Sequence, residues 1–406
     1  MPIDVEFNPL CRFGGGEKML SNMIRNIDIS GIRKIVAAAE EIESRGDKVI
    51  HLEIGRPDFD TPSHVKEAAI RAIESGKVHY TPITGIQELK NSIAAKLERE
   101  NNLKIDPEKE VIVTIGAIQA LYLAILGSVN PGEEVLVPNP GWASYKNIIK
   151  MGRAVPVEYN LVKPDFDLDI EELESKITSN TKMILLCTPN NPTGTVLSRE
   201  KLTQVADIAI KHNLLVLSDE PYERIVFDGN EHISIASLPG MFERTLTVNS
   251  FSKTYSMTGW RIGYLVGSST HMSYFQRAHQ NMVTCPTSFA QWGAIAALDG
   301  SQDCVQEMVR EFDRRRKMVV ARLNAIPNVT CHSPKGTFYA FPDISYYSKN
   351  SEKLAYYLLK EAHVATVQGS AFGTAGEGYL RLSFANSYEL IEESVARLEK
   401  ALISLK

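Results

Sequence analysis

A lysine flanked by hydroxyl side chains is the residue of this chain with the clearest chemical potential. Lys253 follows Ser250 by three positions and Ser252 by one, and Arg261 lies eight positions after it. As a free amine, a lysine attacks an aldehyde to form a Schiff base. Hydroxyls and a guanidinium are groups that bind a phosphate. An amine for an aldehyde beside a phosphate site is typical of pyridoxal 5'-phosphate binding, whereas a lysine in a surface loop is the simpler alternative.

Polar residues follow two apolar runs that we interpret as buried strands. Residues 182–188 form the first run and lead into a turn that contains Asn191, and residues 214–218 form the second and end at Asp219. A helix is predicted over residues 198–212, with Ser198 as its N-cap. The carboxyl ends of strands are where open α/β sheets bind ligands. A carboxylate there could pair with a pyridine nitrogen, although an aspartate that only caps a turn is the alternative.

Three motifs in this order resemble those of a known family. They are Asn-Pro-Thr-Gly at residues 191–194, Asp-x-x-Tyr at residues 219–222, and Ser-x-x-Lys at residues 250–253 followed by Arg261. The chain resembles the class I aminotransferases of the aspartate and aromatic amino-acid kind, which are pyridoxal-phosphate enzymes of fold type I. The resemblance covers about residue 30 to the C-terminus. It implies an α/β fold, with a mainly parallel mixed sheet between helices and a smaller α+β domain.

The resemblance also assigns the residues that hold the cofactor ring. Lys253 is the Schiff-base lysine and general base, and Asp219 is the partner of the ring nitrogen. Asn191 and Tyr222 bind the phenolic oxygen of the ring. Trp142 matches the aromatic residue that stacks on the ring face, where it excludes water. Fixing the ring plane in this way aligns the bond that is cleaved at the substrate Cα with the π system.

A second group of residues is implied for the cofactor phosphate. Ser250, Ser252 and Arg261 hold the phosphate by resemblance. A strand is predicted at residues 111–114, and the helix that follows would offer main-chain N–H groups to an anion. The residues at its start that match the family's phosphate site are Gly116, Ala117 and Ile118. Because Ala117 and Ile118 replace the hydroxyl side chains of many relatives, we expect backbone contacts only.

The substrate carboxylate requires a cation, for which the resemblance implies Arg381. A planar guanidinium binds a carboxylate through two parallel hydrogen bonds. Gly55 corresponds to a glycine whose backbone approaches the same carboxylate, and Trp142 and Asn191 also contact the substrate. Arg56 replaces an acidic residue of relatives, and it is interpreted as a solvated side chain, with a role in specificity as the alternative.

Further residues point to a homodimer with shared active sites. By resemblance Tyr80 reaches the phosphate of the neighbouring subunit, and Ser288 and Gln291 lie in a segment that faces the partner. The glycines of residues 14–16 lack the spacing of a phosphate loop and are interpreted as a flexible arm.

Composition sets limits on other functions. The 406 residues are 44% hydrophobic and 23% charged, which is typical of a globular protein. A net charge of −5 without a basic stripe argues against binding of nucleic acid. No apolar run has the length of a membrane span and no secretory signal is visible, so we expect a cytoplasmic protein without membrane contact. The scattered cysteines and histidines have no metal-ligand spacing, and no metal site is predicted.

The order of elements predicts three parts of the chain. Residues 1–56 would form an N-terminal arm and part of the small domain, residues 57–295 the large cofactor-binding domain, and residues 296–406 the small C-terminal domain. The charged run at residues 311–317 is interpreted as the solvated face of a helix.

The expected activity is amino-group transfer from an L-amino acid to a 2-oxo acid such as 2-oxoglutarate, by a ping-pong mechanism. Aspartate is the first choice of donor by family frequency. Aromatic or broad specificity is the alternative, because Ile118, Tyr145 and Tyr339 could line an apolar pocket. A β-eliminating lyase on the same fold is a further alternative.

Overall fold

The computed structural model of the protein describes residues 21–405. The arm expected around residues 14–16 lies outside the described residues. None of the helices in the described range combines the length and the apolar character that crossing a membrane would require.

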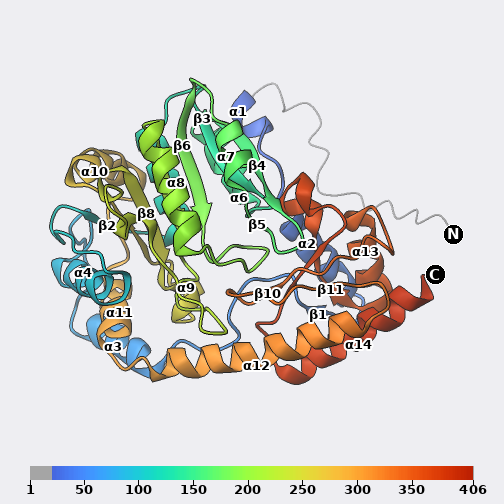
Figure 1. The fold of residues 1–406 in the computed structure, drawn as a ribbon. Coiled ribbons are helices and arrows are strands. Elements are labelled where there is room, and N and C mark those ends of the chain that lie inside the picture. Colours follow the sequence, from blue (N-terminus) through green and yellow to red (C-terminus); the bar gives the residue numbers. More distant parts are fainter. Residues whose placement is uncertain (1–20, 406) are drawn as a thin grey trace.

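A mixed β-sheet forms the centre of residues 111–266 (Figure 1). Its strands are β2 (Val111–Thr114), β3 (Glu134–Asn139), β4 (Val155–Val162), β5 (Asp167–Leu168), β6 (Thr181–Cys187), β7 (Leu215–Asp219), β8 (Thr245–Ser250) and β9 (Gly263–Val266). Within the described residues, these eight strands follow the order β2-β9-β8-β7-β6-β3-β4-β5. β4, β3, β6, β7 and β8 pair in parallel, whereas β9 is antiparallel to both of its neighbours and β5 is antiparallel to β4. The expectation of a mainly parallel sheet is therefore confirmed.

Helices cover both faces of this sheet (Figure 1). They are α3 (Ser63–Glu74), α4 (Gln87–Asn101), α5 (Gly116–Ser128), α6 (Ser144–Met151), α7 (Ile170–Ser175), α8 (Arg199–Lys211), α9 (Phe251–Thr254), α10 (Ser269–Val283) and α11 (Ser288–Asp299). α5, α6 and α10 pack on one face, and α7 and α8 pack on the other. α3, α4 and α11 pack at the β2 end of the sheet, against the face of β2 and β9 that is opposite α5.

β6 shows how the sequence divides its side chains between the two faces. Met183 and Leu185 belong to the core under α5 and α6, whereas Ile184 and Leu186 belong to the core under α8. Successive side chains of a strand point to opposite faces, so an unbroken apolar run is suited to a strand that is covered on both sides. The run therefore ends at the carboxyl edge of the sheet, and Asn191 follows it there.

The two ends of the described chain pack together (Figure 1). Their elements are α2 (Gly31–Glu43), β1 (Ile50–His51), α12 (Asp303–Ala325), β10 (Tyr339–Ala340), α13 (Ser351–Ala362), β11 (Val364–Ala365), β12 (Val367–Gln368), β13 (Leu380–Ser383) and α14 (Tyr388–Ser404). The short helix α1 (Asn22–Arg25) lies instead beside α6. β1 pairs in parallel with β11, and β13 lies between β10 and β12 in a second small sheet. Residues from both ends of the described chain thus share one core, and the three-part division with boundaries at residues 56 and 295 stays a prediction.

The charged run at residues 311–317 lies in α12, but it is not a solvated face throughout. Arg315 and Arg316 are only 6% and 2% exposed. Arg315 donates to Asp58 at 2.7 Å, and Arg316 donates through both terminal nitrogens to Asp228 at 2.7 and 2.8 Å. The interpretation as a solvated face is wrong for these two residues, because their partners come from distant segments that close over the helix.

Candidate active site

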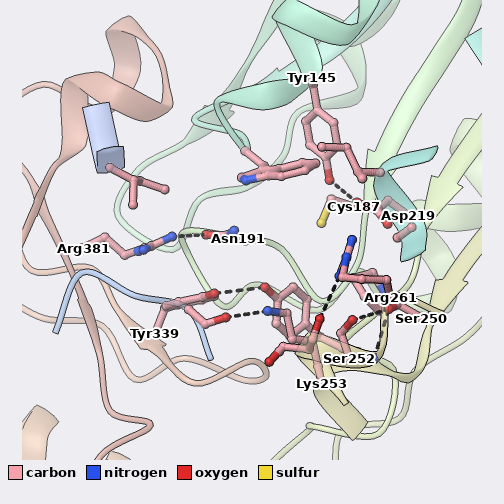
Figure 2. Close-up of a pocket in the computed structure, with 18 residues that line it drawn as sticks. Tyr145, Cys187, Asn191, Asp219, Ser250, Ser252, Lys253, Arg261, Tyr339 and Arg381 are labelled. Carbon is pink, nitrogen blue, oxygen red and sulfur yellow. Dashed lines mark hydrogen bonds between the residues drawn. The ribbon is translucent and has the colours of Figure 1, made fainter. Parts of the chain in front are cut away.

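A cavity of about 290 Å³ opens where β6, β7 and β8 end, between the sheet and the C-terminal elements (Figure 2). Residues predicted from the sequence line most of it. They are Gly55, Ala117, Ile118, Trp142, Asn191, Asp219, Tyr222, Ser250, Ser252, Lys253, Arg261 and Arg381. Side chains from segments more than 300 residues apart, such as those that carry Gly55 and Arg381, therefore meet at one site.

Two of the predicted site residues do not line this cavity. Gly116 lies behind Arg261, and a Cβ atom added to the glycine would come within 2.5 Å of the Arg261 Nη2 atom. The φ of Gly116 is +70°, which also favours glycine at this position. Tyr80 is 87% exposed at the surface. Its predicted contact with a neighbouring subunit stays a prediction.

Lys253 lies in the short helix α9, directly after β8. Ser250 caps this helix, because its hydroxyl accepts a hydrogen bond from the backbone N–H of Ser252 at 3.1 Å. The Lys253 Nζ atom donates to the carbonyl oxygen of Gly55. Burial, together with the positive charges of Arg381 and Arg261, lowers the pKa of Lys253 to about 8, against the opposing effect of the Asp219 carboxylate. About a tenth of this amine is therefore unprotonated and nucleophilic at pH 7, far more than for an ordinary lysine.

Asp219 is the last residue of β7 and lies across the cavity from the lysine. Its side chain is 4% exposed, and its Oδ2 atom accepts a hydrogen bond from the Tyr145 hydroxyl at 2.6 Å. Its Oδ1 atom is buried without a hydrogen-bond partner among the described residues. Burial raises the pKa of Asp219 to about 7, against the opposing effect of the Tyr145 hydrogen bond. The free oxygen is suited to a donor that enters the cavity.

Behind Asp219, a buried polar network continues away from the cavity. Glu220 accepts hydrogen bonds from Ser218 at 2.7 Å and from Ser234 at 2.9 Å, and it contacts His232. Its negative charge contributes to the raised pKa of Asp219. The network therefore acts on the charge of Asp219, whereas the position of the carboxylate is fixed by the end of β7 and by the hydrogen bond from Tyr145.

Arg381, on β13, is buried although it is charged, with 1% of its surface exposed. Its Nη1 atom donates to the Asn191 Oδ1 atom at 3.1 Å (Figure 2). Its Nη2 atom donates to the carbonyl oxygen of Glu53. Its Nε atom has no hydrogen-bond partner among residues 21–405. The guanidinium carbon lies 4.4 Å from the ring centre of Tyr339. A buried cation with an unpaired donor at a cavity wall is suited to binding an anion.

Tyr222 and Tyr339 contact each other beside this arginine. Their hydroxyl oxygens are 3.0 Å apart, and the two side chains are 4% and 1% exposed. The Tyr339 hydroxyl also lies against Gly55, where an added Cβ atom would come within 1.9 Å of it. Glycine is thus required at position 55 because of the close approach of a side chain.

A second group of residues that are suited to an anion lines the same cavity. Ala117 and Ile118 are in the first turn of α5, and Arg261 and the hydroxyl residues Ser250 and Ser252 lie beside that turn. The N-cap residue Ile115 provides no side-chain hydrogen bond to the turn. The backbone N–H groups and the dipole of the helix therefore add to the charge of Arg261.

Several residues that line the cavity are not predicted as site residues from the sequence. The sequence gives Tyr145 and Tyr339 only as candidates for an apolar pocket, and it assigns no site role to Cys187 or Thr258. The spacing of three positions between Trp142 and Tyr145 could have indicated that both face the same site at the start of a helix. Their rings pack edge to face at 5.3 Å.

The structure also bears on the expectations for Arg56, Ser288 and Gln291. Arg56 is exposed and does not line the cavity, which agrees with its interpretation as a solvated side chain. Ser288 and Gln291 are 8% and 0% exposed within the single chain. Gln291 donates to Thr81 at 3.0 Å and accepts from the backbone of Ile86 at 2.8 Å. The Gln291 side chain therefore supports its own chain, and the expectation that this segment faces a partner stays a prediction.

Comparisons with known proteins agree with this arrangement. Residues 47–398 match the family described as aminotransferase class I and II. The chain is 44% identical to aspartate aminotransferase of Pyrococcus abyssi, covering 94% of this chain and 98% of the relative. It is 42% identical to aromatic-amino-acid aminotransferase 2 of Thermococcus litoralis, with the same coverage.

A solved structure extends the similarity to three dimensions. The structure of aspartate aminotransferase from Thermus thermophilus with maleate superposes with a TM-score of 0.90 at 36% identity. The match covers 94% of this chain and 99% of the other. The family match and these relatives cover nearly the whole described chain, so the resemblance inferred from the motifs is confirmed. The chain belongs to the class I and II aminotransferase family, and it is an aminotransferase of fold type I.

Proposed function

We propose that the protein transfers an amino group from an L-amino acid to a 2-oxo acid such as 2-oxoglutarate, with pyridoxal 5'-phosphate as its cofactor. The observation that carries the cofactor proposal is the pair formed by Lys253 and Asp219 in one cavity, an amine of lowered pKa and a carboxylate with an unpaired buried oxygen.

The residues present fit this cofactor. Asp219 Oδ1 would accept a hydrogen bond from the protonated ring nitrogen, and Lys253 would meet the aldehyde. The first turn of α5 with Arg261 and Ser250 would hold the phosphate, and Trp142 would cover one face of the ring. A Cβ at Gly116 would displace the Arg261 guanidinium, so this glycine keeps the phosphate end open.

Pyridoxal 5'-phosphate supplies an aldehyde and a ring that withdraws electrons from the amino acid's Cα. The protein's residues do the remaining work. Arg381 would bind the α-carboxylate and orient the Cα–H bond, and the Lys253 Nζ atom would accept the Cα proton. Asp219 would keep the ring nitrogen protonated by its negative charge.

Aspartate is our first choice of amino-group donor, supported by the name of the Pyrococcus abyssi relative. An aromatic donor is the alternative, and one observation favours it. Within the described residues the cations that line the cavity are Lys253, Arg261 and Arg381, and each already has a proposed role. A second substrate carboxylate would need a further cation, whereas Ile32, Ile118 and Tyr339 offer apolar contacts.

We also propose that the protein works as a homodimer in the cytoplasm. An exposed groove lined by Ile70, Ile73, Trp260 and Phe289 supports the dimer, because apolar surface of this kind favours a protein partner. Arg261 lines both this groove and the cavity, so a second copy in the groove would lie next to the active site. Sedimentation analysis across a range of concentrations tests the oligomeric state.

A spectral screen with product analysis tests the proposed reaction. The cofactor-loaded protein is mixed with each common amino acid, and its visible absorbance is followed. Loss of the absorbance with one amino acid and recovery with a 2-oxo acid supports the transfer and identifies the donor. Release of pyruvate and ammonia from the amino acid, without recovery, would instead support a β-eliminating lyase.

A further inference from the structure

The hydroxyl pair Tyr222–Tyr339 has a role that the proposed assignments leave open. Within residues 21–405, the structure gives the Tyr222 hydroxyl one hydrogen-bond partner, which is Tyr339 at 3.0 Å. Both side chains are buried, and both line the cavity. A buried hydroxyl has one hydrogen to donate and lone pairs to accept with, so the direction of this hydrogen bond decides what Tyr222 presents to the cavity.

The position of Tyr339 is fixed on three sides. Phe338 packs against its ring with centres 4.8 Å apart, and Arg381 lies over the ring at 4.4 Å. Gly55 leaves room for the hydroxyl where a side chain would clash. The Tyr339 oxygen is therefore held in place at Tyr222 by the packing of its own ring.

We propose that Tyr339 is a positioning residue that donates its hydrogen to Tyr222 and thereby turns the Tyr222 hydrogen toward the phenolic oxygen of the cofactor. The inference rests on the proposed pyridoxal-phosphate function. An anionic oxygen in the cavity selects this direction, because the opposite direction would present lone pairs of Tyr222 to a negative charge. A hydroxyl that accepts one hydrogen bond also becomes a stronger donor in the next.

In the protein loaded with cofactor, this hydrogen bond would change the basicity of the Lys253 nitrogen. A stronger donor at Tyr222 stabilises negative charge on the phenolic oxygen. The proton on the Lys253 nitrogen is then held less tightly, and its pKa falls. The titratable and charged groups that face Tyr222 or Lys253 must be kept constant in the test. They are Cys187 on β6, Asp219 on β7, Arg261 after β8, Tyr339 on β10 and Arg381 on β13.

The test is a double-mutant cycle with a spectroscopic readout. The visible absorbance of the cofactor-loaded protein is titrated with pH for wild type, Tyr339→Phe, Tyr222→Phe and the double variant. Tyr339→Phe keeps the ring that packs on Phe338 and Arg381, and it removes only the hydroxyl. We expect the pH midpoint of the absorbance change to rise by about 0.5 unit. In the Tyr222→Phe background, we expect the same substitution to cause no further shift.

Tyr347→Phe is the matched control. Tyr347 belongs to the same hydrophobic core as Tyr339, and its hydroxyl donates to the carbonyl oxygen of Pro327 at 2.7 Å, away from the cavity. We expect the pH midpoint of the absorbance change in Tyr347→Phe to equal that of the wild type.

The outcomes separate this inference from the function on which it rests. If the wild type forms no visible band with pyridoxal 5'-phosphate, the cofactor proposal and the inference are both overturned. If the band forms but Tyr339→Phe leaves its midpoint unchanged, the inference alone is overturned. An equal shift with and without Tyr222, or an equal shift in Tyr347→Phe, would also overturn it, because the effect would then be structural.

Discussion

Tyr145 donates its hydroxyl hydrogen to the Oδ2 atom of Asp219 at 2.6 Å, between two side chains that are 2% and 4% exposed. The tyrosine opposes the effect of burial on the carboxylate, because a hydrogen bond to the charged form stabilises it. It also occupies one carboxylate oxygen and leaves the other directed to the cavity. Tyr145 thus affects both the charge and the orientation of Asp219.

Replacing Tyr145 by phenylalanine should weaken cofactor binding. The variant loses a hydrogen bond to a charged group, which is worth about 1.5–3 kcal/mol, so we expect the Kd for pyridoxal 5'-phosphate to rise about tenfold or more. The loss should grow as pH falls, since more of the Asp219 carboxyl is then protonated. Fluorescence titration of the apoprotein at several pH values measures it. Tyr159→Phe removes a buried hydroxyl that donates to Leu185 at 2.9 Å outside the cavity, and an equal loss there would contradict the prediction.

Asp219 should make the stability of the apoprotein depend on pH. Its pKa is raised from the ordinary 3.8 to about 7 by burial, so the folded state favours the neutral carboxyl. The shifted pKa adds to the free energy of unfolding. This stabilisation is fully present below about pH 4, is lost as pH rises through about 7, and totals about 4 kcal/mol. We expect Asp219→Asn to lack this part of the pH dependence. Urea unfolding of both apoproteins at acidic and at neutral pH measures the difference, and parallel curves would refute it.

Lys253→Ala should abolish turnover and still bind the cofactor. The variant loses the amine that meets the aldehyde and moves the Cα proton, so we expect a loss of more than about 1,000-fold in kcat. The groups proposed for the ring nitrogen and the phosphate remain in place. Equilibrium dialysis measures the retained binding, and coupled assays measure the turnover. Turnover within about tenfold of the wild type would be fatal to the assignment of this lysine.

Arg381→Lys should impair substrate binding more than chemistry. A lysine keeps the positive charge but cannot form two parallel hydrogen bonds with a carboxylate, so we expect kcat/KM to fall about 100-fold, mainly through KM. The matched control is Arg56→Ala, which removes an exposed cation outside the cavity. Steady-state kinetics with aspartate and with phenylalanine test both variants. A large loss in Arg56→Ala with aspartate alone would restore a role in specificity for that arginine.

Gly55→Ala should displace the Tyr339 side chain. The added Cβ atom would lie 1.9 Å from the Tyr339 oxygen but 3.0 Å from the nearest ring carbon. We therefore expect a stability loss of about 1–3 kcal/mol and a fall in turnover of more than about tenfold. The second substitution Tyr339→Phe should recover part of the stability, because it removes the atom that clashes. Thermal unfolding of the single and double variants measures this, and a purely additive result would show that the clash lies elsewhere.

Local patterns predicted the elements that carry the site. The helix expected over residues 198–212 is observed as α8, with the Ser198 hydroxyl accepting from the Lys201 N–H at 3.2 Å. The strand expected at residues 182–188 is observed one residue earlier as β6. These predictions succeeded because apolar runs, turn residues and N-caps act within a few residues of the chain.

Contacts between residues that are far apart in the sequence could not be predicted from it. The partner of Tyr145 lies 74 positions away, and that of Tyr339 lies 117 positions away. Arg316 is buried because it meets Asp228, 88 positions earlier. Composition alone assigns a charged run to the solvent, and only the tertiary structure brings a carboxylate from another segment to the guanidinium. The resemblance to a family assigned roles to Asp219 and Tyr222, but it did not identify Tyr145 and Tyr339, which contact them.

The pairing of β1 with β11 has a consequence for how the protein is made. A ribosome releases residues 111–266, which carry the whole central sheet, well before residue 364 is available to pair with residue 50. Arg381 reaches the carbonyl of Glu53 later still. The nascent chain can therefore form its sheet while the substrate side of the cavity is incomplete. The cavity is therefore complete only after residues 364–381 have been made and have packed against the segment around β1.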